Sequence, residues 1–392
     1  MKLNPSLIAL ATGAFGIGVT EFSPMGLLAL IAADLKVSIP TAGLLVSAYA
    51  VGVMVGAPLM TLTTGHITRR SLLIGLAAIF TIGNLMAALA DSYGMLMAAR
   101  MVTSLNHGAF FGVGSVVAAS MVPPGRAASA VAAMFIGLTL ATVVGVPLAT
   151  WTGEQLGWRA PFWGIAILGL VTMAALRWTL PDWAAPKSGG ALAELRMLGR
   201  ASVLAALLLT VLGASAMFTV YTYIVPTLQQ ETGASIGFVT AMLVIYGLGL
   251  TVGNWLGGRY ADHSVDRTLM ISLAGLSLLL IALSVMVQFA IPVAGLVFAW
   301  GVASFAIVPP LQVRVMTAAA DAPNLASAIN IGAFNLGNAV GAGLGGAVIA
   351  AGIGYRAVPL AGAAMAGLAL AAAFILSRNR PAAGPGEPCP DV

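Results

Sequence analysis

The sequence contains little charge and almost no cysteine. Only 7% of its 392 residues are Asp, Glu, Lys or Arg, whereas an ordinary soluble domain contains roughly 25%. So few charges cannot cover a water-facing surface of this size, which excludes a soluble globular enzyme, a disordered chain and a nucleic-acid-binding protein. The single cysteine, Cys389, lies in the C-terminal tail, so a disulfide framework and a cysteine-based metal site are excluded as well.

Catalytic and nucleotide-binding motifs are also missing. The sequence has no P-loop, no HExxH, no GxSxG and no Cys/His metal cluster. We therefore expect no enzymatic activity, no metal and no cofactor. Without a nucleotide site, any ATP-driven process would need another subunit.

Long apolar runs dominate the chain instead, and 60% of the residues are hydrophobic. A membrane-spanning helix needs about 20 mostly apolar residues, and a barrel strand only about 10 in alternation. Twelve runs meet the helical criterion, at 7–32, 41–62, 71–90, 93–121, 127–150, 160–180, 201–228, 235–258, 268–287, 291–316, 325–350 and 355–376. The sequence therefore predicts an all-α integral membrane protein with twelve transmembrane helices. The first run is too long for a signal peptide, so we expect it to be retained.

The basic residues predict the orientation, because Lys and Arg are enriched in cytoplasmic loops. With the N-terminus inside, 13 of them fall on the cytoplasmic side and 3 on the outer side. The outer ones are Lys36, Arg159 and Arg356. Both termini are therefore expected in the cytoplasm.

The two halves of the chain resemble one another. The stretch that begins at Ala128 matches the stretch that begins at Ala326, and a second match pairs Tyr49 with Tyr246. A 6+6 repeat is typical of transporters that alternate access around a midplane site. We expect a six-helix bundle over 1–180, a cytoplasmic linker over 181–200, a second bundle over 201–377 and a tail over 378–392.

Several motifs carry a family resemblance that covers nearly the whole chain. They are Thr20-Glu21-Phe22, Ala57-Pro58 through Arg69-Arg70, and Gly145-Val146-Pro147 with Gly157-Trp158-Arg159. With the twelve runs and the repeat, the chain resembles the major facilitator superfamily, and within it the bacterial drug/proton antiporters, including sugar-efflux and arabinose-efflux permeases. The resemblance implies a multi-pass protein of the bacterial inner membrane that uses the proton gradient as its source of energy.

The resemblance implies a set of gating or conformational residues, namely Arg69, Arg70, Gly145, Pro147, Asp262 and Arg267. The chain departs from the family pattern at two points. Gly65 stands where the loop between helices two and three usually has Asp, although Asp262 keeps that acid in the second half. Val146 precedes Pro147, where the antiporter signature usually has Gly.

Three ionisable residues well inside the predicted spans are candidates for function, because charge is costly there: Glu21, Arg100 and His107. At about 1.5 Å per residue, Glu21 and Arg100 both lie roughly 10 Å below the outer surface. We expect Glu21 to be the proton-titrating acid, because burial favours its neutral form and a nearby Arg100 favours its charged form. A static buried pair, or an Arg100 that reaches the headgroups, stays possible.

His107 could relay protons, since imidazole titrates near neutral pH, or it could only make an interhelical hydrogen bond. Outside the spans, Glu154 and Arg159 are expected in an outer loop, solvated or gate-forming, and Asp34 at the interface. Small residues recur every four positions in three runs. They are Gly137, Ala141 and Gly145; Gly249, Gly253 and Gly257; and Gly337, Gly341 and Gly345. We expect these faces at the contact between the two halves.

The resemblance implies that the first, fourth, seventh and tenth helices line the substrate cavity. Candidates for substrate binding are the aromatic residues on these helices and two amides on the eleventh. They are Phe15, Phe22, Phe110, Phe111, Phe218, Tyr221, Trp300, Phe305, Asn330 and Asn335. Each could equally serve packing or helix–helix hydrogen bonding.

The sequence thus favours a monomeric secondary transporter that exports a small organic compound in exchange for protons. The alternatives are a sugar uniporter or proton symporter of the same fold, and a non-transporting sensor or assembly subunit. The expected partners are a small-molecule substrate, protons and the lipid bilayer, with no nucleic acid. The substrate stays open, since cations, sugars and nucleosides all fit these residues.

Overall fold

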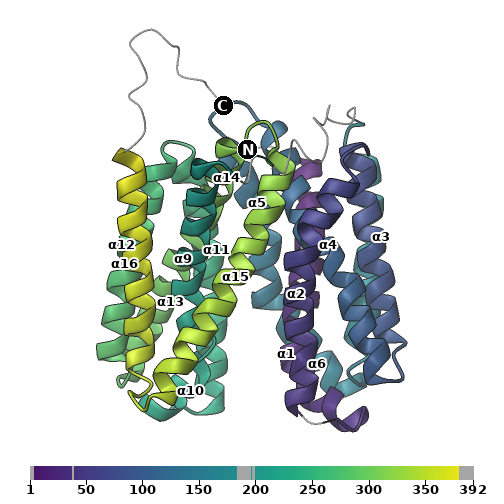
Figure 1. Cartoon of the computed structure of the whole chain (residues 1–392). Coiled ribbons are helices and arrows are strands. Elements are labelled where there is room, and N and C mark those ends of the chain that lie inside the picture. Colours follow the sequence, from purple (N-terminus) through teal and green to yellow (C-terminus); the bar gives the residue numbers. More distant parts are fainter. Residues whose placement is uncertain (1–3, 38, 183–195, 197–198, 379–392) are drawn as a thin grey trace. The chain divides into compact units, whose positions relative to one another are not determined.

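The computed structural model describes residues 4–37, 39–182, 196 and 199–378, and all regular structure in that part is helical (Figure 1). The first six predicted runs form α1 (Pro5–Asp34), α2 (Ile39–Thr63), α3 (Arg69–Ala88), α4 (Tyr93–Ser120), α5 (Ala127–Leu140) with η1 (Ala141–Gly145) and α6 (Val146–Leu156), and α7 (Ala160–Thr179). The last six form α9 (Ala201–Tyr221) with α10 (Ile224–Glu231), α11 (Ile236–Ala261), α12 (Val265–Met286), α13 (Ala290–Ala306) with α14 (Val308–Ala318), α15 (Pro323–Ala350) and α16 (Ala357–Arg378).

Polar caps and glycines set the ends of several helices. The Asn4 side chain accepts the Ser6 amide at 3.0 Å at the start of α1, and Ser235 caps α11 in the same way. Gly157 ends α6 with φ at +90°, a backbone conformation that residues other than glycine rarely adopt. Each cap satisfies backbone groups that the helix leaves open.

Three of the predicted runs are divided, and proline lies near each division. η1 is a five-residue π-helix that immediately precedes the turn containing Pro147. In the run at 291–316, α13 ends at Ala306 and α14 begins at Val308, directly before Pro309 and Pro310. The break between α9 and α10 was not predicted, and Pro226 lies in the first turn of α10.

Eleven helical segments of the described chain are long and apolar enough to span a membrane. α4 has 28 residues but is not among them. It contains Arg100, Asn106 and His107, whose polarity lowers its hydropathy. Twelve spans and cytoplasmic termini therefore stay predictions.

The chain forms two compact units. Unit 1 comprises Met1–Ala118, Ala133–Gly199 and Ala319–Gly332, and unit 2 comprises Ala119–Ala132, Arg200–Ala318 and Ala333–Val392. In unit 1, α1 packs on α7, α2 and α6, and α3 packs on α7. In unit 2, α11 packs on α13, and α16 packs on both α12 and α9 (Figure 1). Most of the predicted linker and almost all of the predicted tail lie outside the described residues.

The expectation that the glycine faces meet between the halves is wrong for these glycines, because each face packs inside its own unit. A Cβ on Gly137 would contact the Ala11 carbonyl of α1. A Cβ on Gly253 would contact the Val302 carbonyl of α13, and one on Gly341 would contact the Ser215 carbonyl of α9. Such contacts bring helix backbones together, so these glycines build the units themselves.

Candidate functional site

Arg100 is buried inside unit 1, with 2% of its surface exposed. Its Nη1 donates to the Thr20 carbonyl at 2.6 Å, and its Nε donates to the Leu45 carbonyl at 3.5 Å. Its Cζ lies 4.1 Å from the centre of the Tyr49 ring, within the range of a cation–π contact. Nη2 has no partner in the described part of the chain. Arg100 therefore does not reach the headgroups but joins α4 to α1 and α2.

Thr20 extends this contact to α3. Its hydroxyl donates to Asn84 Oδ1, and Asn84 in turn donates to the Phe80 carbonyl at 2.8 Å. Thr20 and Asn84 are both buried. Buried polar groups of this kind need partners, and here each one finds a partner within the unit.

Glu21 follows Thr20 directly, so the guanidinium lies next to the backbone of the predicted proton-titrating acid. The Glu21 side chain is half-buried. None of the ion pairs in the described residues joins Glu21 to Arg100. The structure thus brings the two groups together without a direct salt bridge, and their role in proton coupling stays a prediction.

His107 is also buried, and it contacts α2 through Tyr49. Its Nδ1 lies 3.1 Å from the Tyr49 hydroxyl, which makes the interhelical hydrogen bond that the sequence left open. The His107 ring lies 5.2 Å from Phe111, which packs 4.9 Å from Phe135. Tyr49 therefore connects the two polar candidates of α4, Arg100 and His107. Sequence reasoning did not single it out, although its match with Tyr246 was a signal.

Unit 2 has an aromatic cluster around Tyr246, the counterpart of Tyr49. Tyr246 stacks on Tyr221 at 5.2 Å and contacts Trp300 at 4.2 Å between ring centres. Phe218 joins the cluster, 6.1 Å from Tyr221 and 5.5 Å from Phe334. The two related tyrosines thus have different partners. Tyr49 contacts the Arg100 guanidinium in unit 1, whereas Tyr246 contacts the Trp300 indole in unit 2.

The other predicted substrate-binding residues differ in accessibility. Phe110 is fully buried and packs against Gly13, and Phe305 is also buried. Phe22 is half-buried. Asn330 is buried, whereas Asn335 is half-buried. Phe15 is half-buried and lines two apolar hollows of unit 1, of about 450 and 340 Å³, that lie along α1.

Two of the predicted gating positions lie at the start of α3. Arg70 forms an ion pair with Asp182 at 2.5 Å and donates to the Leu180 carbonyl at 3.4 Å, so it ties α3 to the residues after α7. Arg69 is half-buried, and its Nε has no partner in the described residues.

Gly145 and Pro147 form the junction between η1 and α6. A Cβ on Gly145 would overlap Val19 of α1, so the absence of a side chain permits close packing of the π-helix. Because π-turns interrupt the regular hydrogen-bond ladder, this junction is a point where the helix can change direction.

Asp262 binds the first turn of α5 inside unit 2. Its Oδ1 accepts the Ser129 amide at 3.1 Å, and its Oδ2 accepts the Ser129 hydroxyl. Ser129 is the third residue of α5, so the carboxylate occupies the place of a helix cap and meets the positive end of the helix dipole.

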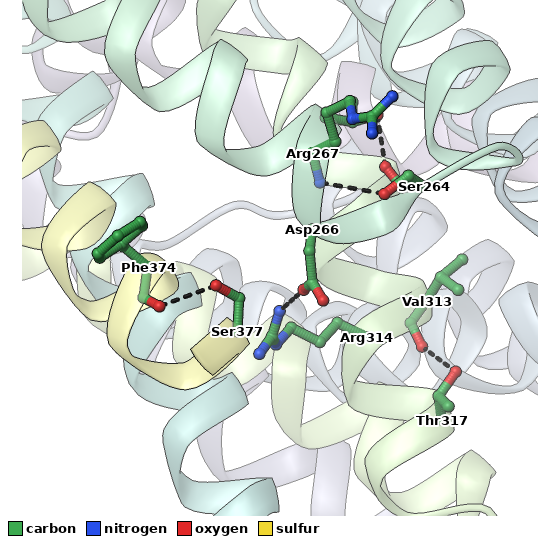
Figure 2. A network of polar contacts seen from close by, with 9 residues as sticks. Ser264, Asp266, Arg267, Val313, Arg314, Thr317, Phe374 and Ser377 are labelled. Carbon is green, nitrogen blue, oxygen red and sulfur yellow. Dashed lines mark hydrogen bonds and ion pairs between the residues drawn. The ribbon is translucent and has the colours of Figure 1, made fainter. Parts of the chain in front are cut away.

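Arg267 is exposed, and its amide is capped by Ser264 at 3.3 Å. The preceding residue, Asp266, makes the contact between helices instead. Figure 2 shows its carboxylate pointing toward Arg314 of α14, with which it forms an ion pair. Asp266 was not predicted, because it falls between two apolar runs, where an acid is expected to be solvated.

The residues above define a class of protein. Long apolar helices in two units, with buried polar groups between the helices of one unit, are typical of a membrane carrier. The Major Facilitator Superfamily profile matches residues 10–329 and 207–388.

Individual relatives agree with the profile. The Inner membrane transport protein YdhP of Escherichia coli (strain K12) is 58% identical over 381 residues, covering 97% of this chain and 98% of YdhP. A Chloramphenicol resistance protein of Streptomyces lividans is 35% identical over 342 residues, covering 86% of each chain. The structure of the proton:xylose symporter XylE is similar with a TM-score of 0.77 and 14% identity, over 96% of this chain and 95% of XylE, which shows the shared fold.

The chain belongs to the Major Facilitator Superfamily. It is a multi-pass transport protein of the inner membrane and not an enzyme.

Proposed function

We propose that the protein is a proton-coupled antiporter that exports a small organic compound by alternating access, with Glu21 as the proton-titrating acid. The observation that supports this most is the position of the Arg100 guanidinium. Its Nη1 lies 2.6 Å from the carbonyl oxygen of Thr20, the residue before Glu21, and no ion pair in the described residues joins Arg100 to Glu21. A carboxyl group beside a cation, but not bound by it, can exist both with and without its proton.

The same proposal includes twelve spans, both termini in the cytoplasm and a monomeric carrier. The excess of basic residues in the predicted cytoplasmic loops supports the orientation. The direction of transport is supported by the chloramphenicol resistance relative, since resistance by a carrier implies export. The aromatic cluster of Phe218, Tyr221 and Trp300 supports an apolar or uncharged substrate.

The test is transport by purified protein in proteoliposomes with an imposed pH gradient. Chloramphenicol, a lipophilic cation and a neutral sugar serve as substrates. We expect one of them to move against its gradient with counterflow of protons, and Glu21→Gln to abolish this uphill movement. Glu154→Gln is the matched control, because Glu154 is exposed. Uphill transport that survives in Glu21→Gln, or an absence of proton movement with every substrate, would contradict the proposal.

A further inference from the structure

α1 contains a proline in its interior. The helix runs from Pro5 to Asp34 and continues through Pro24. Proline has no amide hydrogen, so it cannot donate to the carbonyl four residues earlier, which is that of Thr20. In a membrane helix such a carbonyl needs another donor, because there is no water to supply one.

Arg100 is that donor. Its Nη1 binds the Thr20 carbonyl at 2.6 Å, which is the shorter of its two hydrogen bonds to backbone oxygens. Its positive charge therefore contacts two carbonyls and the face of Tyr49, and none of the ion pairs in the described part of the chain gives it a carboxylate partner. The carbonyl that holds Arg100 is the one that Pro24 leaves open.

The carboxylate of Glu21, one residue after Thr20, competes with the Thr20 carbonyl for the Arg100 guanidinium. A carboxylate is a stronger acceptor for guanidinium than a carbonyl and can bind it with two parallel hydrogen bonds. If Arg100 turned from Thr20 to Glu21, the pair would hold Glu21 in its ionised form. An open carbonyl at Thr20 opposes that turn.

We propose that Pro24 is a positioning residue. Because Pro24 leaves the Thr20 carbonyl without its helical hydrogen bond, that carbonyl holds Arg100 beside Glu21 without a salt bridge. Glu21 therefore remains able to exchange its proton. This inference rests on the proposed role of Glu21. It concerns a residue that does not itself touch protons or substrate.

The test restores the missing amide. In Pro24→Ala, the residue 24 amide takes the Thr20 carbonyl, and Arg100 closes onto Glu21. We expect the infrared band of the protonated Glu21 carboxyl, identified by its loss in Glu21→Gln, to reach half intensity about one pH unit lower than in the wild type. Pro24→Gly restores the same amide and should give the same shift. It also serves as the second variant should the alanine protein not fold.

Two controls separate this effect from a general loss of proline. Pro58 also lies inside a helix, α2, but neither described hydrogen bond of Arg100 goes to the carbonyl of the residue four positions before Pro58. Pro58→Ala should therefore leave the infrared band of Glu21 unchanged. In an Arg100→Gln background, Pro24→Ala should have no additional effect, because the group that moves is absent.

The outcomes also distinguish this inference from the proposed function. A Glu21 band that titrates as in the wild type in both Pro24 variants, or a shift that persists without Arg100, overturns the inference even if transport is coupled to protons. A wild-type protein without proton coupling, but with the expected Arg100-dependent shift, overturns the proposed function and leaves the positioning role of Pro24 standing.

Discussion

Arg159 forms an ion pair with Asp34, with 2.7 Å between Nη1 and Oδ2, and the second unit repeats it between Arg356 and Glu231 at 2.6 Å. The two arginines are separated by the same number of residues as the two acids, so the pairs are copies within the internal repeat. In unit 1 the pair joins the end of α1 to the start of α7. In unit 2 it joins the end of α10 to the start of α16.

Each arginine also binds a third segment. Arg159 donates to the Ala90 carbonyl at 2.8 Å after α3, and Arg356 donates to Gln288 at 2.9 Å after α12. Each arginine therefore fastens three segments at one end of its unit.

Removal of either arginine should destabilise the protein slightly. Exposed ion pairs contribute about 0–1 kcal/mol, so Arg159→Gln and Arg356→Gln should each lower the melting temperature in detergent by a few degrees at most. Arg126 is an exposed loop arginine whose side chain makes no described hydrogen bond, and Arg126→Gln is the control. Equal melting temperatures for all three variants and the wild type would show that these contacts add nothing to stability.

The Asp34 pair should be insensitive to pH under physiological conditions. Hydrogen bonds from Trp158 and then Arg159 hold the pKa of Asp34 below its ordinary value of 3.8. A depressed pKa means that the stabilisation is complete above 3.8 and is lost as the pH falls below it. Asp34→Asn should therefore lower the melting temperature equally at about pH 5 and pH 8, with the difference from wild type shrinking in stronger acid. A difference that already changes between pH 5 and pH 8 would contradict this assignment.

Tyr49→Phe should separate the two contacts of Tyr49. The phenyl ring can remain under Arg100, whereas the hydrogen bond to His107 is lost. Hydrogen bonds between membrane helices contribute on average about 0.6 kcal/mol, so we expect a small loss of stability. If His107 relays protons, the pH profile of transport should change as well. Tyr260 is exposed, and Tyr260→Phe should alter neither quantity.

Helix positions could be predicted from the sequence because apolar runs of this length have few alternatives in a membrane. The similar depth of Glu21 and Arg100 was also predictable, since depth follows from counting residues along a helix. Counting residues does not show which way each side chain points about the helix axis once the helices are packed. The role of Tyr49 and the contact of Arg100 with a carbonyl depend on that direction, so only the folded structure reveals them.

The glycine faces illustrate the same limit. A four-residue spacing shows that Gly249, Gly253 and Gly257 share one face of α11, but every helix in a bundle has several neighbours. Packing selects α13 as the partner. The sequence offset between the two halves was more informative. The residue at that offset from Asp34 is Glu231, which forms the second ion pair.

Gly253→Ala should destabilise unit 2. The added methyl group would overlap the Val302 carbonyl, which belongs to the backbone of α13 and cannot move alone. Overpacking of this kind costs about 1–3 kcal/mol. A methyl group on Gly275 of α12 would meet no neighbouring segment within 4 Å, so Gly275→Ala should be neutral or slightly stabilising, because alanine is the better helix former. The measurement is thermal unfolding of both variants in the same detergent, and equal behaviour would contradict the packing argument.

Asp262 should affect transport through the first turn of α5. Its carboxylate accepts both the amide and the hydroxyl of Ser129, and loss of such a helix cap costs about 0.5–2 kcal/mol. If this contact forms in only one of the alternating states, its loss shifts the population of the two states by about 2-fold to 30-fold. Asp262→Ala should therefore change the initial rate of transport in proteoliposomes several-fold, and Asp262→Asn, which retains one acceptor oxygen, should change it less. Asp91 is an exposed acid, and Asp91→Ala is the control. A change of melting temperature in Asp262→Ala without any change of rate would assign Asp262 to stability alone, because a contact present in both states cannot shift the equilibrium between them.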